Sequence, residues 1–225
     1  MPLKIVMRDD DDPLADERRS ALHSLATRPE SSSLETGERG ASREAQRLRR
    51  LLLRTSELDS IDPPQPLLSG LLYLDTLALA YGPSGVGKSF AAIDIAMSIV
   101  SDLEDWHGQT ISHGPVLYVI AEGAAGVKQR AEAWQEYHGR KGEVIWLPVA
   151  VDLLDSESVD GLSDIVREIG PVLIVIDTLS RSIAGAEENS SRDMGVIVNH
   201  LTRLQAAARS CVLIVHHTGK DTGKG

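Results

Sequence analysis

A glycine-rich segment is the part of the sequence whose residue types and spacing point most directly to chemistry. Residues 82–89 read GPSGVGKS, which matches the pattern G-x-x-x-x-G-K-[ST] at every specified position. Glycines allow a tight turn in which consecutive backbone N–H groups face phosphate oxygens, and the N-terminus of a following helix adds a positive dipole. Lys88 would bring a full charge to the β- and γ-phosphates, and Ser89 would offer a hydroxyl to Mg²⁺. The segment therefore predicts a site for ATP and Mg²⁺, formed by Gly82, Pro83, Ser84, Gly85, Val86, Gly87, Lys88, Ser89 and Phe90.

An aspartate at the end of an apolar run is the candidate metal ligand. Residues 172–176 read VLIVI and are followed directly by Asp177. In a parallel sheet, the C-terminal ends of the strands form the edge at which α/β proteins bind ligands. We therefore predict that Asp177 and the hydroxyl of Ser89 hold the Mg²⁺ ion, which prefers oxygen ligands.

A glutamate in a similar position is the candidate general base. Glu122 follows the apolar run 116–121 and precedes Gly123, so we expect it at the same edge of the sheet, with flexible backbone beyond it. Hydrolysis of ATP needs a group that orients and deprotonates the attacking water, and we assign this catalytic role to Glu122. Glu187 and Glu188 are rivals for the role, in a segment that is typical of a mobile loop.

Two adjacent histidines end a further apolar run. Residues 212–215 read VLIV and lead into His216 and His217. A neutral imidazole can hydrogen-bond to a γ-phosphate, which favours a role as a γ-phosphate sensor. The alternatives are two structural histidines at a strand end, or a metal site, which is disfavoured because no Cys/His cluster at metal-site spacing accompanies the pair.

Short apolar runs alternate with helical patterns from residue 67 onward. The expected strands lack polar alternation, as buried parallel strands do, and cover residues 77–81, 116–121, 144–147, 172–177 and 212–216. The expected helices cover residues 88–101, 127–138, 156–169 and 192–209. This alternation predicts an α/β fold with a mostly parallel central sheet covered by helices on both faces.

The first 66 residues differ in texture from this core. They are rich in charged residues and serine and end in the sequence DPPQP, which predicts a partly disordered tail and a stiff linker. Arginines at positions 43, 47, 50 and 54 recur at helical spacing beside a leucine face, which predicts an amphipathic helix over about residues 42–58. This helix could pack on the core with its arginines in water, or could contact a partner or nucleic acid. The predicted division is thus an N-terminal region, 1–66, and a core, 67–225.

Composition excludes several classes of protein. The 225 residues include 33 acidic and 23 basic ones, and the net charge of -10 argues against attraction of the whole surface to nucleic acid, although it allows a local basic groove. The single cysteine, Cys211, excludes a disulfide framework. No apolar stretch approaches the roughly 18 residues of a membrane span, and the first 12 residues end in four aspartates rather than in an apolar signal core. We therefore expect a cytoplasmic protein that does not associate with membranes.

Five sequence blocks, taken in order, resemble the RecA-like ATPases of the RepA type, the hexameric replicative helicases and related ATPases of plasmids and phages. The blocks are 81–89 (YGPSGVGKS), 117–123 (LYVIAEG), 175–181 (VIDTLSR), 188–194 (ENSSRDM) and 215–220 (VHHTGK). The resemblance spans about residues 67–225 and implies a RecA-like P-loop core. It implies catalytic roles for Lys88 and Glu122 and a metal-binding role for Asp177. It also places His217 at the sensor position, with His216 beside it at the nucleotide.

The resemblance further implies that the chain assembles with copies of itself into a ring, such as a hexamer, or into a filament. In such assemblies a neighbouring subunit completes the nucleotide site with a basic finger. Members of the family usually continue with further strands and DNA-facing loops, whereas this chain stops nine residues after His216. We therefore expect a core that is truncated at its C-terminus, in which Lys220 and Lys224 are the only late candidates for the finger.

The leading functional hypothesis is an Mg²⁺-dependent ATPase that drives a motor on single-stranded DNA, most similar to a replicative helicase. The first alternative is a RecA-like recombination ATPase that forms filaments. The second is a nucleotide-dependent regulatory or loader module that does not translocate. A small-molecule kinase fits less well, because no arginine-rich lid segment is evident.

Overall fold

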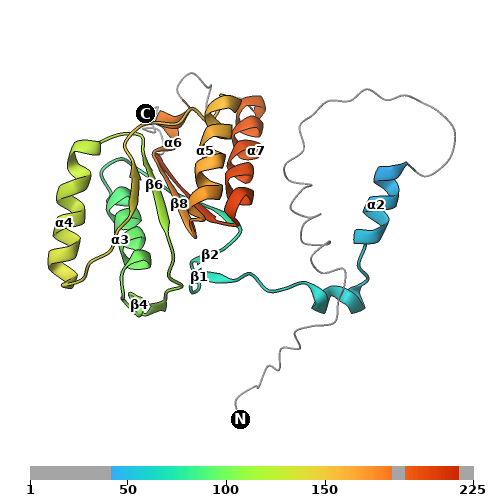
Figure 1. Ribbon diagram of the computed structural model, residues 1–225, viewed down its shortest axis with the longest axis horizontal. Helices are drawn as coiled ribbons and strands as arrows, with labels where there is room; N and C mark the ends of the chain where they lie inside the picture. The colour runs from blue at the N-terminus through green and yellow to red at the C-terminus, as the bar shows by residue number, and fades with distance from the viewer. Residues whose placement is uncertain (1–41, 184–190, 218–225) are drawn as a thin grey trace, which may run out of the picture. The chain divides into compact units, whose positions relative to one another are not determined.

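The computed structural model describes residues 42–183 and 191–217. The chain divides into two units, Met1–Pro63 and Pro64–Gly225 (Figure 1). The rival bases and the late basic residues of the sequence analysis lie outside the described residues; they are Glu187, Glu188, Lys220 and Lys224.

The first unit contains two short helical segments where the sequence predicts one helix over 42–58. Helix α2 (Arg43–Leu51) begins at Ser42, whose Oγ accepts a hydrogen bond from the backbone N–H of Ala45 at 3.1 Å. The helix ends because the backbone is extended at Leu52 and again at Arg54. A 3-10 helix, η1 (Thr55–Ser60), starts there, and a glutamate side chain within it caps its first turn. The fourth arginine of the predicted face therefore lies outside the helix.

The second unit is built on a five-stranded sheet in which every neighbouring pair of strands is parallel. Its order is β3 (Thr76–Gly82), β9 (Cys211–His217), β8 (Leu173–Asp177), β6 (Val116–Ile120) and β7 (Ile145–Leu147). All five predicted strands are present, and no end is shifted by more than one residue. The predicted α/β fold with a parallel sheet is confirmed.

Strand β3 differs from the prediction in its burial. The sequence predicts a strand buried on both faces, but among the described strands β3 pairs only with β9 and so forms an edge of the sheet. Its alanines, Ala78 and Ala80, pack against the core, whereas Leu79 and Tyr81 on the other face are exposed. An uninterrupted apolar run thus does not distinguish an edge strand from a central one.

Helices cover both faces of the sheet (Figure 1). Helices α3 (Lys88–Val100) and α4 (Val127–His138) pack on one face, and α5 (Ser156–Ile169) and α7 (Ser191–Ala208) pack on the other. Their bounds lie within one residue of the predicted ones. Helices α4 and α5 end where Gly139 and Gly170 adopt left-handed backbone conformations, with φ of 62° and 60°.

Short elements connect these layers. Two two-stranded antiparallel sheets and two helical turns are present: β1 (Pro66–Leu68) with β2 (Leu72–Tyr73), β4 (Asp105–Trp106) with β5 (Gln109–Thr110), η2 (Ala124–Gly126) and α6 (Leu179–Ser182). They are too short for periodicity to predict. Among the helices of the described part, none combines the length and the apolar character that a membrane crossing requires.

Candidate active site

The glycine-rich segment forms a loop between β3 and α3. Gly85 and Gly87 have φ values of 84° and 92°, a backbone conformation that other residues adopt only under strain. A Cβ atom at either position would meet no atom within 4 Å, so the requirement for glycine comes from the backbone rather than from crowding. Gly87 directly precedes α3, whose first turn leaves backbone N–H groups without partners in the helix. The loop is thus open above these glycines and ends at a helix N-terminus, which suits a phosphate group.

The side chain of Lys88 lies against this loop. Its Nζ donates hydrogen bonds to the carbonyl oxygens of Gly82 at 2.8 Å and Pro83 at 2.7 Å. The ammonium group is therefore held at the loop by backbone acceptors, where it can attract a phosphate.

Asp177 lies beside the loop, at the C-terminal end of β8. It is buried, and each of its carboxylate oxygens accepts one hydrogen bond from a side-chain hydroxyl. Oδ1 accepts from Ser89 in α3 at 3.1 Å, and Oδ2 accepts from Tyr118 in β6 at 2.7 Å. Burial and, secondarily, the neighbouring Asp177 carboxylate raise the pKa of Tyr118 far above its ordinary value. Tyr118 therefore stays protonated and acts as a hydrogen-bond donor to Asp177.

The pair of Ser89 and Asp177 fits a divalent cation such as Mg²⁺. A hydroxyl oxygen and a carboxylate oxygen lie 3.1 Å apart, and both are ligand types that Mg²⁺ takes. Within residues 42–183 and 191–217, no group of three or more His, Cys, Asp or Glu side chains could hold a metal ion. Mg²⁺ commonly uses one or two carboxylates and completes its shell with water and substrate phosphates, so a single carboxylate beside a hydroxyl is a sufficient protein contribution.

Glu122 lies two residues after the end of β6, at the same edge of the sheet. Strands β6 and β8 are neighbours, with Ile120 paired to Asp177. The Glu122 carboxylate has two partners: Oε2 accepts a hydrogen bond from Nε of Arg181 at 3.1 Å, and Oε1 lies 3.4 Å from Nε2 of His217. Glu122 is partly exposed, so water can reach it.

The two histidines lie between the loop and Asp177, because β9 lies between β3 and β8. His216 is paired with Tyr81 and His217 with Gly82, the first residue of the loop. The Nδ1 atoms of both histidines are buried and have no hydrogen-bond partner among the described residues. His217 is therefore close to the start of the loop and also contacts Glu122.

An aromatic side chain and a guanidinium group lie at the exposed side of the loop. Phe90, in the first turn of α3, is largely exposed, and the guanidinium carbon of Arg130 from α4 lies 4.7 Å from the centre of its ring. The ring does not contribute to the core, which leaves it available to a ligand or a partner.

The structure brings the described candidates, the loop with Lys88 and Ser89, Asp177, Glu122 and the two histidines, to one edge of the sheet. It also adds residues to which the sequence analysis assigns no role. Tyr118 binds Asp177, Arg181 binds Glu122, and Arg130 stacks on Phe90. A tyrosine hydroxyl within a fully apolar strand is a signal that could have identified Tyr118. No local pattern identifies Arg181 or Arg130, because their partners lie 59 and 40 positions away in the sequence.

A parallel sheet with a GPSGVGKS loop at the end of one strand and an aspartate at the end of another defines a P-loop nucleotide-binding protein. Residues 42–223 match the family model of the AAA domain, so the chain belongs to this family of P-loop ATPases. The matched region begins at the N-cap of α2, upstream of the predicted core boundary at residue 67. A comparison with curated proteins gives no match.

Proposed function

We propose that the chain hydrolyses ATP in the presence of Mg²⁺ and uses this reaction to drive a motor on single-stranded DNA, as replicative helicases do. Nucleotide-dependent ATPase activity is the property of the family. The observation that carries the hydrolytic part is the position of Glu122, a partly exposed carboxylate at the same sheet edge as the loop and Asp177. The resemblance of the five sequence blocks to the RepA type supports the motor on DNA.

The residues of the site can divide the work of hydrolysis as follows. The loop and Lys88 would hold the β- and γ-phosphates, and Ser89 and Asp177 would hold Mg²⁺, which polarises the phosphate oxygens when bound. Glu122 would accept a proton from a water molecule whose oxygen forms a bond to the γ-phosphorus, while the bond from that phosphorus to the β–γ bridging oxygen breaks. The products are ADP and inorganic phosphate, which takes up the proton from Glu122.

Exposed apolar side chains around the loop support assembly with further copies of the chain. Tyr81, Val86 and Phe90 are 70%, 62% and 61% exposed, and all three lie within ten residues of one another at the loop. Large apolar side chains gathered on a surface are typical of a binding site or an interface. We infer that a neighbouring subunit covers this side of the loop, in a ring such as a hexamer. Sedimentation analysis with and without ATP and Mg²⁺ checks this inference.

The decisive experiment is steady-state ATP turnover by the full chain with Mg²⁺, with and without single-stranded DNA. Glu122→Gln should lower the rate by about 100-fold or more, since a general base contributes on this order, and Lys88→Ala should abolish both binding and turnover. Matched controls are Glu132→Gln and Lys128→Ala, which alter an exposed ion pair on α4. Full activity of Glu122→Gln would show that another group is the base.

The response to DNA separates the motor from its alternatives. A rate increase of several-fold with single-stranded DNA, followed by strand displacement, supports the helicase-like motor. Stimulation without strand displacement, with filament formation, would favour the recombination ATPase. A rate that no nucleic acid changes would favour the regulatory or loader module.

A further inference from the structure

Arg181 contacts the proposed general base, Glu122, but has so far been given no role in ATP hydrolysis. Its Nε lies 3.1 Å from Oε2 of Glu122. Arg181 lies in α6, just after β8, and Glu122 lies two residues after the end of the neighbouring strand β6. Their side chains are 66% and 39% exposed. An ion pair this exposed contributes only about 0–1 kcal/mol to folding. Stability is therefore a weak explanation for the contact, and its position beside the site suggests a role in the reaction.

The segment that carries Arg181 is firmly held. Leu179, the first residue of α6, and Ile183, the residue directly after this helix, are both buried. They pack in the core between the sheet and helices α5 and α7. The carbonyl oxygen of Ser182 also accepts a hydrogen bond from the backbone N–H of Leu153 at 2.7 Å. The guanidinium of Arg181 thus extends from a fixed backbone.

The segment that carries Glu122 is held less firmly. The ladder between β6 and β8 ends at the pair of Ile120 and Asp177. Directly after it, the backbone N–H of Ala121 donates a hydrogen bond to the carbonyl oxygen of Asp177 at 2.7 Å. Gly123 follows Glu122 with a φ of 71°, and a Cβ added there would meet nothing within 4 Å. No residue from 122 to 125 is buried. The orientation of the Glu122 carboxylate therefore depends on its side-chain partners.

Those partners hold one carboxylate oxygen each. Arg181 donates to Oε2, and Nε2 of His217 lies 3.4 Å from Oε1. Each carboxylate oxygen can accept more than one hydrogen bond, so both contacts leave room for a water molecule. A general base must lie about 2.6–3.2 Å, between heavy atoms, from the group whose proton it removes. A carboxylate held by one side chain from α6 and one from the end of β9 meets this requirement better than one free to rotate.

We propose that Arg181 is a positioning residue, which orients the Glu122 carboxylate for deprotonation of the attacking water. This inference rests on the proposed ATP hydrolysis. Arg181 acts through Glu122 and not through the nucleotide, so its loss lowers kcat and leaves the affinity for ATP unchanged. This distinguishes it from an arginine that binds a phosphate, whose loss would weaken binding.

The experiment measures kcat, KM and the affinity for a fluorescent ATP analogue in the full chain with Mg²⁺. Arg181→Ala should lower kcat by about tenfold to a hundredfold, a part of what a general base contributes, with an unchanged affinity. Arg181→Lys should recover some of the rate, because it keeps the positive charge. Arg167→Ala is the matched control, since Arg167 pairs with Asp164 in an exposed ion pair on α5.

A double-mutant cycle then tests whether Arg181 acts through Glu122. In the Glu122→Gln background, measured by single-turnover kinetics, Arg181→Ala should have little further effect. An equal effect in both backgrounds, a weaker affinity for the analogue, or a wild-type kcat for Arg181→Ala would each overturn the proposal. Absence of turnover and of nucleotide binding in the unmodified chain would instead refute the proposed function itself.

Discussion

Two hydroxyl groups approach Asp177 at its two carboxylate oxygens, and they differ in what each can do. Ser89 is only partly buried and opens into the loop, so it can turn its oxygen toward a cation. Tyr118 is fully buried, and its pKa is raised, so it remains a donor at any ordinary pH. Tyr118 therefore fixes one oxygen of Asp177 and leaves the other to face the loop.

Removal of the Tyr118 hydroxyl should destabilise the fold. Tyr118→Phe keeps the ring but leaves Oδ2 of the buried Asp177 without its donor, which costs about 1–3 kcal/mol of unfolding free energy. Urea denaturation measures this loss. Tyr137→Phe is the control, because Tyr137 is an exposed tyrosine on α4 and should change nothing. Equal stability of Tyr118→Phe and the unmodified chain would contradict the assigned role of this hydrogen bond.

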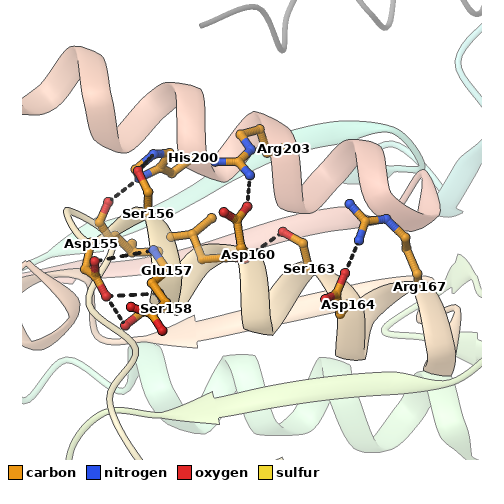
Figure 2. A network of polar contacts seen from close by, with 12 residues as sticks. Asp155, Ser156, Glu157, Ser158, Asp160, Ser163, Asp164, Arg167, His200 and Arg203 are labelled. Atoms are coloured by element: carbon orange, nitrogen blue, oxygen red, sulfur yellow. Dashed lines mark hydrogen bonds and ion pairs between the residues drawn. The ribbon is translucent and has the colours of Figure 1, made fainter.

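Helix α5 shows how one element is fixed by its first turn (Figure 2). Asp155 caps its N-terminus: the carboxylate accepts hydrogen bonds from the backbone N–H groups of Glu157 and Ser158 at 3.3 and 3.0 Å, and from Ser158 Oγ at 2.6 Å. His200, which lies in α7, hydrogen-bonds through Nδ1 to the carbonyl oxygen of Leu153 at 2.8 Å. The bonds at Asp155 lower its pKa, chiefly through the side chain of Ser158 and then through its backbone N–H.

The cap predicts a stability that depends on pH. Because the pKa of Asp155 is lower in the folded chain than in the unfolded one, its contribution is complete above the unfolded pKa and is lost as the pH falls through the folded value. Asp155→Ala should therefore be less stable than the unmodified chain at pH 7, and this difference should shrink in acid. Denaturation curves at several pH values between 7 and 3 measure it.

Asp155→Asn is the matched control for this prediction. Asparagine retains an oxygen that can cap the helix but does not titrate. We expect this variant to keep most of the stability at pH 7 and to lose the pH-dependent part. A constant difference between Asp155→Ala and the unmodified chain across the pH range would refute the assignment.

At the scale of the whole second unit, one sheet joins two separate apolar cores. Alternate residues of β6, β8 and β9 point into a core with α3 and α4, and the others into a core with α5, α6 and α7. Cys211 begins β9, between β3 and β8, and is fully buried. Burial raises the pKa of its thiol to about 11.

Cys211 should therefore report unfolding of this unit. At pH 8 the folded chain should resist alkylation by iodoacetamide, since the thiol is both protonated and inaccessible, whereas the urea-unfolded chain should react readily. Mass spectrometry counts the modified chains, and the single cysteine makes the assignment unambiguous. ATP with Mg²⁺ should slow the reaction further, because a ligand that binds only the folded state stabilises it. Rapid alkylation of the folded chain would contradict the observed burial.

The sequence alone determined most helices and strands of the second unit and the motif of its glycine-rich loop. Apolar runs, helical periodicity and capping residues are local signals, so strands such as β8 and helices such as α5 were predictable almost to the residue. The glycines, Lys88 and Ser89 lie within eight consecutive positions, so the P-loop motif that they form could be recognised from the sequence. Where local signals competed, as after Leu51 in the first unit, the predicted helix was too long.

Only the tertiary structure decided which side chains meet. The order of strands follows from packing between segments far apart in the chain, and it places β3 at the edge and His217 between the loop and Glu122. The contacts of Tyr118 with Asp177 and of Arg181 with Glu122 each span 59 positions, beyond the reach of any local pattern. They arise because parallel strands bring their C-terminal ends to one edge, where groups that the sequence keeps apart become neighbours.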